Sequence, residues 1–312
     1  VGKSDFQFKT SPGLPIILIL NLYLSREIGT FFMVNFNGTL VDQANAFISA
    51  DNRGYQYGDA VFETIHVWRS NILFSEDHYF RLMSGMRILR MAIPMNFTME
   101  FIEAEIQKTL EANPFAHQNY RVRITVNRKA GGRYTPVNND VDYLIVVEPL
   151  LVSNFENPSV SVALVDLFKD HYITPGLLSN VKSNNRLINI LGGIYAKENG
   201  YSNCLLLNSD KQVVEALNGN VFLVKGTVIK TPPLTSGCIK GVMRKQVIDY
   251  ISKSNDYTLE EAAVSPFELQ KSDELFITNV IQGVVPVLQY RKQQFSQTVS
   301  KQLFEGVLAK LS

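Results

Sequence analysis

The sequence predicts a mixed α and β (α+β) protein of two domains with a cleft between them. From Met33 onward, short β-branched and aromatic runs alternate with amphipathic segments of helical period. The chain has 312 residues, 46% hydrophobic and 19% charged, which suffices for two well-buried cores. Two prolines and several polar residues interrupt the pattern at 149–158. We therefore expect a small N-terminal domain at 33–148, a linker at 149–158 and a larger C-terminal domain at 159–312.

Residues 1–32 differ from the rest of the chain. A polar lead precedes an apolar run at 14–24, which is shorter than the about 20 residues that a membrane-spanning helix needs. No small-residue cleavage site follows this run, as a signal peptide would require. We expect a poorly ordered extension outside both domains. A sharper hypothesis is that Met33 is the biological start.

The expected N-terminal domain begins with a hairpin and continues with strands and two helices. Asn37-Gly38 is a turn dipeptide inside the run 34–40, and alternation at 61–68 predicts a strand. Tyr79, Leu82, Met86 and Leu89 recur at helical spacing. The remaining predicted elements are a helix at 98–112 and strands at 121–127 and 143–147.

The expected C-terminal domain has the same mixture of elements. A helix is predicted where Leu187, Leu191, Ile194 and Tyr195 share a face, and Gly200 would end it. The other predicted elements are strands at 159–167, 204–207, 221–224, 228–231 and 274–278, a helix at 240–252 and a last helix from about 297.

The charge and the cysteine content exclude several classes of protein. Thirty basic residues against 29 acidic ones leave a net charge of +1, so nothing favours nucleic acid or an anionic membrane as a partner. The two cysteines, Cys204 and Cys238, form no CxxC pair, and the four histidines lack metal-ligand spacing. We expect a cytoplasmic protein without a metal site, acting on a small molecule.

Lys182 and Glu215 are the residues that carry a chemical hypothesis. A lysine amine can form a Schiff base with an aldehyde cofactor, and a carboxylate can keep a pyridine nitrogen protonated. Together they could hold pyridoxal phosphate from both ends. Alone, each is equally typical of a solvated surface charge.

Six motifs in order give these two residues a context. The chain resembles the class IV pyridoxal-phosphate family, which contains D-amino-acid and branched-chain aminotransferases and aminodeoxychorismate lyase, from Met33 to its C-terminus. The motifs are 51–64 (DNRGYQYGDAVFET), 78–82 (HYFRL), 182–187 (KSNNRL), 213–222 (VVEALNGNVF), 240–244 (KGVMR) and 273–279 (DELFITN).

The resemblance implies a two-domain fold with pyridoxal 5′-phosphate in the interdomain cleft. It makes Lys182 the Schiff-base lysine, Glu215 the partner of the ring nitrogen and Arg81 a phosphate ligand; by itself Arg81 is typical of a surface helix. Backbone amides near a helix start suit a phosphate. The resemblance places such amides at two sites, Val242 with Met243 and Asn279 with Val280. It gives the glycine-bearing turn after Arg53 a structural role and implies a homodimer.

The residues expected to line the substrate side of the cleft, here called the substrate wall, distinguish between two possible reactions. D-amino-acid aminotransferases hold the substrate carboxylate with a tyrosine, an arginine and a histidine, whose positions are Phe62, Arg133 and Thr135 here, so two of the three groups are missing. The loop 127–136 (NRKAGGRYTP) resembles the Gly-Gly-Arg-Gly-Tyr of aminodeoxychorismate lyases, although the glycine after Arg133 is absent.

The leading hypothesis is therefore a lyase that forms 4-aminobenzoate and pyruvate from 4-amino-4-deoxychorismate in folate synthesis. The alternative is a class IV transaminase for branched-chain or D-amino acids. Both take a small-molecule amine. The family typically builds the Arg133 region at a dimer interface, so Arg133 could serve a neighbouring site. A non-catalytic binding protein is the third possibility, and the intact positions of Lys182, Glu215 and Arg81 argue against it.

Overall fold

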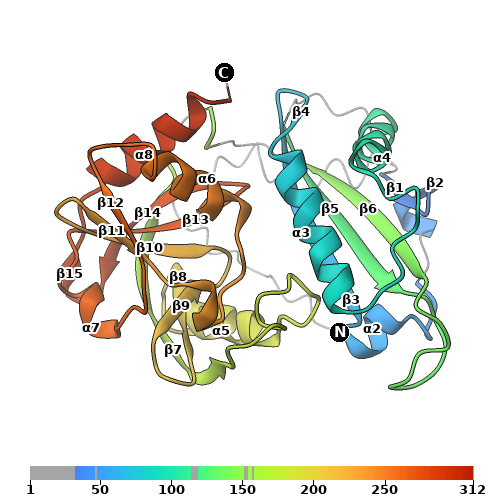
Figure 1. Ribbon diagram of the computed structural model, residues 1–312, viewed down its shortest axis with the longest axis horizontal. Helices are drawn as coiled ribbons and strands as arrows, with labels where there is room; N and C mark the ends of the chain where they lie inside the picture. The colour runs from blue at the N-terminus through green and yellow to red at the C-terminus, as the bar shows by residue number, and fades with distance from the viewer. Residues whose placement is uncertain (1–31, 46–47, 114–118, 151–153, 157, 312) are drawn as a thin grey trace, which may run out of the picture.

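Two β-sheets, each with its own helices, lie side by side in the structure (Figure 1). The structure is a computed structural model that describes residues 32–45, 48–113, 119–150, 154–156 and 158–311. Residues 1–31 of the predicted extension, and 151–153 and 157 of the predicted linker, lie outside the described residues.

The first sheet is antiparallel throughout, with the strand order β2-β1-β6-β5-β3-β4. The predicted hairpin at Asn37-Gly38 is present, and both residues have positive φ, which suits this turn. The strands are β1 (Met33–Phe36), β2 (Thr39–Asp42), β3 (Ala60–Trp68), β4 (Asn71–Ile72), β5 (Asn119–Arg128) and β6 (Val141–Pro149).

Two helices pack on one face of this sheet, α3 (Ser75–Ile88) and α4 (Met99–Glu111). Thr98 begins α4 because its side chain accepts a hydrogen bond from the Phe101 amide at 3.2 Å. Leu82 and Met86 on α3 bury themselves against Val61 and neighbouring strand residues, as their helical spacing predicted. The other face of β3 turns toward the second sheet, where His66 lies 3.2 Å from the Val280 carbonyl.

The second sheet mixes parallel and antiparallel pairs in the order β12-β11-β10-β13-β14-β7-β8-β9, with β15 beside β14. Its strands are β7 (Val162–Ile173), β8 (Asn203–Asn208), β9 (Val213–Ala216), β10 (Asn220–Lys225), β11 (Val228–Thr231), β12 (Thr258–Glu261), β13 (Glu274–Asn279), β14 (Gly283–Tyr290) and β15 (Gln293–Gln294).

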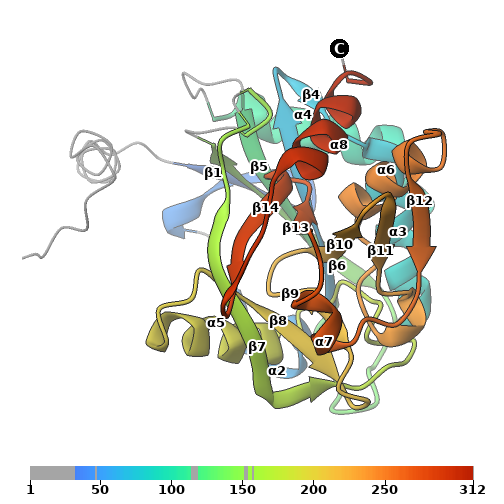
Figure 2. The same cartoon turned by 90° about the vertical axis from the view of Figure 1, so that its left-hand side faces the viewer.

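Helices cover this sheet from different sides (Figure 2). One group, α6 (Val242–Ile251) and α8 (Thr298–Leu308), packs against β13 and closes one core. By contrast, α5 (Leu187–Glu198) lies on β7 and β8, and the short α7 (Pro266–Leu269) begins with a capping box at Ser265.

Several elements differ from the sequence-based expectation. The segment after Asn52 is a short helix, α2 (Arg53–Tyr57), ended by Gly58 in the left-handed region, and not a simple turn. The strand expected at 159–167 begins at Val162 and extends to Ile173. The strands β4, β9, β12, β14 and β15 and the helix α7 were not predicted from the sequence. Of these, β4 and β15 have only two residues each, and β14 contains a proline, which is uncommon inside a sheet.

The apolar face predicted for α5 is not buried within this chain. Leu187, Leu191 and Ile194 are between 40% and 66% exposed. The helix contacts its sheet through Gly192 and Ala196 instead, and a Cβ at Gly192 would lie 2.6 Å from the Leu217 side chain. Small residues allow this close approach, and they turn the larger apolar residues outward.

In the described part of the chain, no helix is long and apolar enough to cross a membrane.

Candidate cofactor and substrate site

Lys182 lies where the second half of the chain touches the edge of the first sheet. Its carbonyl accepts a hydrogen bond from the Phe62 amide at 2.9 Å, and the next residue, Ser183, forms an antiparallel bridge with Val61 on β3. The amine of Lys182 lies 4.4 Å from the centre of the Phe62 ring. Hydrogen bonds to β3 therefore hold the backbone at Lys182.

The surroundings of Lys182 favour a neutral amine. Burial, together with the positive charges of Arg81 and Arg186, lowers the pKa of Lys182 from 10.5 to about 7. The carboxylates of Glu63 and Glu215 act in the opposite direction without restoring the ordinary value. A neutral amine is the form that can attack an aldehyde or accept a proton.

Glu215 lies on β9 in the interior of the protein. One of its oxygens, Oε2, accepts a hydrogen bond from the Ile239 amide at 2.9 Å. Burial raises the pKa of Glu215, whereas that hydrogen bond and the charges of Arg186 and Lys182 lower it, and the net direction is upward. A buried carboxylate with raised proton affinity is suited to share a proton with a ring nitrogen.

Arg81 is held by a buried carboxylate. Its Nε donates to Glu63 Oε1 at 2.7 Å and its Nη2 donates to Glu63 Oε2, in the paired geometry that arginine forms with carboxylates. His78 Nδ1 also lies 2.7 Å from Glu63. Burial alone would raise the pKa of Glu63, but Arg81 and His78 lower it to about 2.

The third nitrogen of Arg81 joins this group to the start of α6. Arg81 Nη1 donates to the Lys240 carbonyl at 3.0 Å, and Lys240 directly precedes Gly241, the residue before the first turn of α6. That first turn contains Val242 and Met243, which are both buried. No side chain caps the helix start at Gly241. Arg81 and the helix start thus converge, as a phosphate site requires.

Gly241 is needed for this convergence because Asn220 lies against it. A Cβ at Gly241 would come 2.0 Å from Asn220 Oδ1, and Asn220 Nδ2 donates to the Ile239 carbonyl at 2.9 Å. Asn220 is also paired with Thr278 between β10 and β13. Among the described residues, the buried hydroxyl of Thr278 has no hydrogen-bond partner.

The turn between β13 and β14 holds the other predicted phosphate contact. The Asn279 side chain accepts from the amides of Ile281 and Gln282, so it fixes its own turn. Val280 is nearly buried, and its carbonyl accepts from His66, whose pKa burial lowers to about 4. This arrangement leaves backbone groups, and not the Asn279 side chain, for a phosphate.

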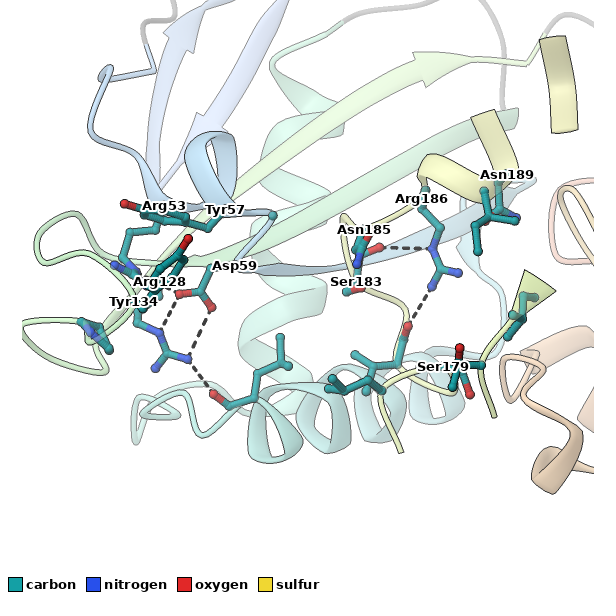
Figure 3. Close-up of a pocket in the computed structure, with 18 of the residues that line it drawn as sticks. Arg53, Tyr57, Asp59, Arg128, Tyr134, Ser179, Ser183, Asn185, Arg186 and Asn189 are labelled. Carbon is teal, nitrogen blue, oxygen red and sulfur yellow. Dashed lines mark hydrogen bonds and ion pairs between the residues drawn. The ribbon is translucent and has the colours of Figure 1, made fainter. Parts of the chain in front are cut away.

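A cavity of about 540 Å³ opens beside these residues (Figure 3). Glu215 lines it, together with Val181 and Ser183, which flank Lys182. Arg186 points into the same region from the start of α5. The remaining polar and charged lining includes Arg53, Tyr57, Asp59, Arg128, Tyr134, Ser179, Asn185 and Asn189.

The predicted substrate wall is only partly assembled within one chain. Phe62 is buried, with the Arg123 guanidinium 3.8 Å from its ring on one side and Lys182 on the other. Arg133 and Thr135 are exposed, and their side chains do not line the cavity; Tyr134 and Pro136 of the same loop do. Within its own chain, therefore, the structure does not bring Arg133 and Thr135 to Lys182.

Arg53 has a structural role, as the motif suggested. It donates to Asp59 at 2.9 Å and to the carbonyls of Gly131 and Arg133 at 3.2 and 2.6 Å. Asp59 is shared with Arg128, so two arginines hold one carboxylate.

Glu63, Arg123 and Arg186 contact the predicted residues or their backbone but were not assigned from the sequence. Glu63 had a usable signal, because a carboxylate on the apolar face of a strand needs a buried cationic partner. From the sequence, Arg186 was identified only as a member of the motif 182–187, without a role of its own. Arg123 had no signal, since alternation alone does not say which face of β5 meets the cofactor.

These residues fit pyridoxal phosphate. Glu215 presents a buried carboxylate, Lys182 has a lowered pKa, and Arg81 lies beside an uncapped helix start that Gly241 keeps open. The orphaned hydroxyl of Thr278 adds a donor near Asn220. When bound, the cofactor would supply an electron-withdrawing ring to a substrate amine.

Comparison with known proteins gives consistent relatives. D-alanine aminotransferase of Bacillus licheniformis is 28% identical over 81% of this chain and 87% of that protein. Chloroplastic branched-chain-amino-acid aminotransferase 5 of Arabidopsis thaliana is 30% identical over 80% of this chain and 64% of that protein. Aminodeoxychorismate lyase of Vibrio harveyi is 26% identical over 76% and 84%, respectively.

The fold and the family model agree with these relatives. A branched-chain aminotransferase of Thermoproteus uzoniensis, crystallised with norvaline, superposes with a TM-score of 0.79, covering 90% of this chain and 96% of that one at 22% identity. The model of the amino-transferase class IV family matches residues 60–290. Both the predicted fold class and the predicted cofactor are thereby confirmed. The chain belongs to the class IV aminotransferase family of pyridoxal-phosphate enzymes.

Proposed function

We propose that this enzyme is a lyase resembling aminodeoxychorismate lyase, which forms 4-aminobenzoate and pyruvate from 4-amino-4-deoxychorismate in folate synthesis. The observation that carries the proposal is the Gly131-Gly132-Arg133 loop. Both glycines have positive φ, 109° and 76°, and a Cβ at Gly132 would meet the Thr135 carbonyl at 2.2 Å. The Gly-Gly-Arg pattern shared with the lyases is therefore a requirement of this loop.

The wall beside Lys182 also favours the lyase over a D-amino-acid transaminase. Phe62 presents a ring without a hydroxyl, and Thr135 cannot supply a ring nitrogen, so two groups of the carboxylate trap are absent. The cavity of about 540 Å³ has room for a cyclic substrate. Arg53, Arg128 and Arg186 outnumber the carboxylates of Asp59 and Glu215 in its lining, which suits an anionic substrate.

The side chains would divide the proton transfers between them. Lys182, neutral near pH 7, would remove the proton from the ring carbon next to the substrate nitrogen. Loss of that proton accompanies cleavage of the ether C–O bond, so that the ring becomes aromatic and enolpyruvate leaves to take up a proton as pyruvate. Glu215 would keep the cofactor nitrogen protonated, while Arg81 and the start of α6 would hold the phosphate.

The second candidate is a transaminase for branched-chain or D-amino acids. Two of the relatives above carry such activities, at identities of 30% and 28% against 26% for the lyase. The same Lys182 would then move a proton from the substrate α-carbon to the cofactor carbon. This candidate needs no change in the residues that bind the cofactor.

We also propose that the enzyme is a homodimer. Leu187, Ile190, Leu191 and Ile194 form an exposed apolar face on α5, each at least 40% exposed. An apolar patch of this kind is typical of a protein interface. A partner would also explain why Arg133 is exposed and does not line the cavity of its own chain. Sedimentation equilibrium would measure the mass; a monomer at micromolar concentration would contradict the homodimer.

Two assays on the purified protein separate the candidates. With 4-amino-4-deoxychorismate, the lyase should release pyruvate and a fluorescent aromatic amine, and Lys182→Ala should abolish both. With D-alanine or leucine alone, a transaminase should convert the cofactor to its amine form. Conversion of the cofactor by D-alanine or leucine, without release of pyruvate from 4-amino-4-deoxychorismate, would make the transaminase the leading candidate. Protein that stays colourless with added cofactor would contradict both.

A further inference from the structure

We propose that Arg186 is a positioning residue for Lys182: its guanidinium joins the carbonyls on either side of the lysine and thereby fixes the direction of the lysine side chain. Arg186 Nη2 donates to the Val181 carbonyl at 2.7 Å, and Nε donates to the Ser183 carbonyl at 3.2 Å. The inference rests on the proposed role of Lys182 as the residue that binds the cofactor.

These bonds complete the restraint on the backbone around Lys182. Its own carbonyl accepts from the Phe62 amide on β3, so three successive carbonyls, 181 to 183, all accept hydrogen bonds. The next amide, of Asn184, donates to the Ala60 carbonyl at 2.9 Å. The peptide groups that contain the Val181 and Lys182 carbonyls set φ and ψ of Lys182, and with them the direction of its Cβ.

Arg186 is well suited to this task because its planar group carries several donors in a fixed arrangement. Figure 3 shows the side chain leaving the start of α5 and turning back toward the loop of Ser179 and Ser183. It also lines the cavity with Glu215, so its charge lies within the site. Among the described residues, no acidic side chain forms a salt bridge with Arg186.

That unpaired charge has a second effect on the lysine. Arg186 is one of the groups that lower the pKa of Lys182, after burial and Arg81. Removing the charge should raise the pKa and reduce the neutral fraction of the amine near pH 7. Replacement by lysine keeps the charge but cannot span two carbonyls in the same way, so the two effects are separable.

The test uses the full chain without cofactor and two probes. Pyridoxal 5′-phosphate reports the covalent step through its visible absorption, between pH 6 and 9. Pyridoxine 5′-phosphate lacks the aldehyde, and calorimetry gives its noncovalent affinity. The variants are Arg186→Met, Arg186→Lys and a control, Arg87→Met, which removes an exposed arginine on α3.

Arg186→Met should slow the covalent step at least about tenfold, since small misplacements of a reacting group have effects of this size, and should raise its pH midpoint. Arg186→Lys should keep the wild-type midpoint yet remain slower. Both should bind pyridoxine 5′-phosphate within about threefold of wild type, and Arg87→Met should change nothing.

An unchanged covalent rate in both Arg186 variants would overturn the proposal. So would an equal loss of affinity for both probes, because Arg186 would then only shape the site. Should Arg186→Met fail to fold, the rate in Arg186→Lys decides alone. A wild-type chain that binds pyridoxine 5′-phosphate but never forms the coloured adduct would instead refute the proposed function.

Discussion

Glu63 and Arg81 form a buried pair across β3 and α3, with Arg81 Nε 2.7 Å from Glu63 Oε1. Glu63 thereby orients the arginine, whose remaining nitrogen reaches the carbonyl before α6. The proposed phosphate site is therefore built from both halves of the chain. The position of Arg81 in that site depends on the carboxylate of Glu63, which would itself contact no ligand.

Glu63→Gln should weaken both folding and cofactor binding. The lowered pKa of Glu63, about 2 against 4.5, adds stability that is present above pH 4.5 and is lost as the pH falls toward 2. We expect the variant to lose roughly 2 kcal/mol at pH 7, and less at pH 3. Urea unfolding at both pH values measures this. Glu76→Gln, an exposed change on α3, is the control; an equal loss at both pH values would contradict the mechanism.

Lys182→Met should bind no cofactor covalently but should stabilise the cofactor-free protein. The folded amine has a pKa of about 7 and the unfolded one about 10.5, so the unfolded chain binds more protons between these values and wild-type stability rises with pH. The variant has no amine to bury, so it lacks the free-energy cost of deprotonating that amine on folding. We expect a gain of roughly 2–4 kcal/mol at pH 7 that fades toward pH 10. Thermal unfolding across this range tests it, and equal stability at pH 7 would refute the burial of a titrating amine.

Gly241→Ala should impair cofactor binding through geometry alone. Its Cβ would meet Asn220 Oδ1 at 2.0 Å and displace the start of α6 from Arg81. We expect at least about a tenfold loss of affinity for pyridoxal 5′-phosphate. The matched control is Gly193→Ala in α5, where no atom lies within 4 Å of the new Cβ. That change should raise stability by about 0.5–1 kcal/mol. Equal affinity in both variants would remove α6 from the phosphate site.

Arg133 should act on the site of the partner subunit. Arg133→Met and Lys182→Ala homodimers should both be inactive, the first through loss of a substrate contact. A mixed dimer would combine an intact lysine in one chain with an intact Arg133 in the other, giving one complete site. Unfolding and refolding the two variants together should restore up to about a quarter of wild-type activity, since half the dimers are mixed and each has one site of two. Two inactive homodimers without recovery on mixing would show that Arg133 does not act on the site of the partner subunit.

Much of the fold was predictable because its signals are local. The Asn37-Gly38 hairpin, the helix that begins near Thr98 and the helical spacing of Leu82 and Met86 each depend on neighbouring residues, and all three are present in the structure. The family motifs likewise identified Lys182 and Glu215 as candidates from the sequence. The domain boundaries remain a prediction.

What the sequence could not determine is how distant residues meet. The position of Glu63 on an apolar strand face called for a cationic partner, but only the packing of α3 on β3 made Arg81 that partner. Arg186 acts through backbone carbonyls that any residue could present. The outward face of α5 and the exposure of Arg133 depend on which elements pack together. The sequence alone thus determined the element types and the chemical groups, whereas tertiary packing decided which charges share a low-dielectric site, and with them the pKa of Lys182.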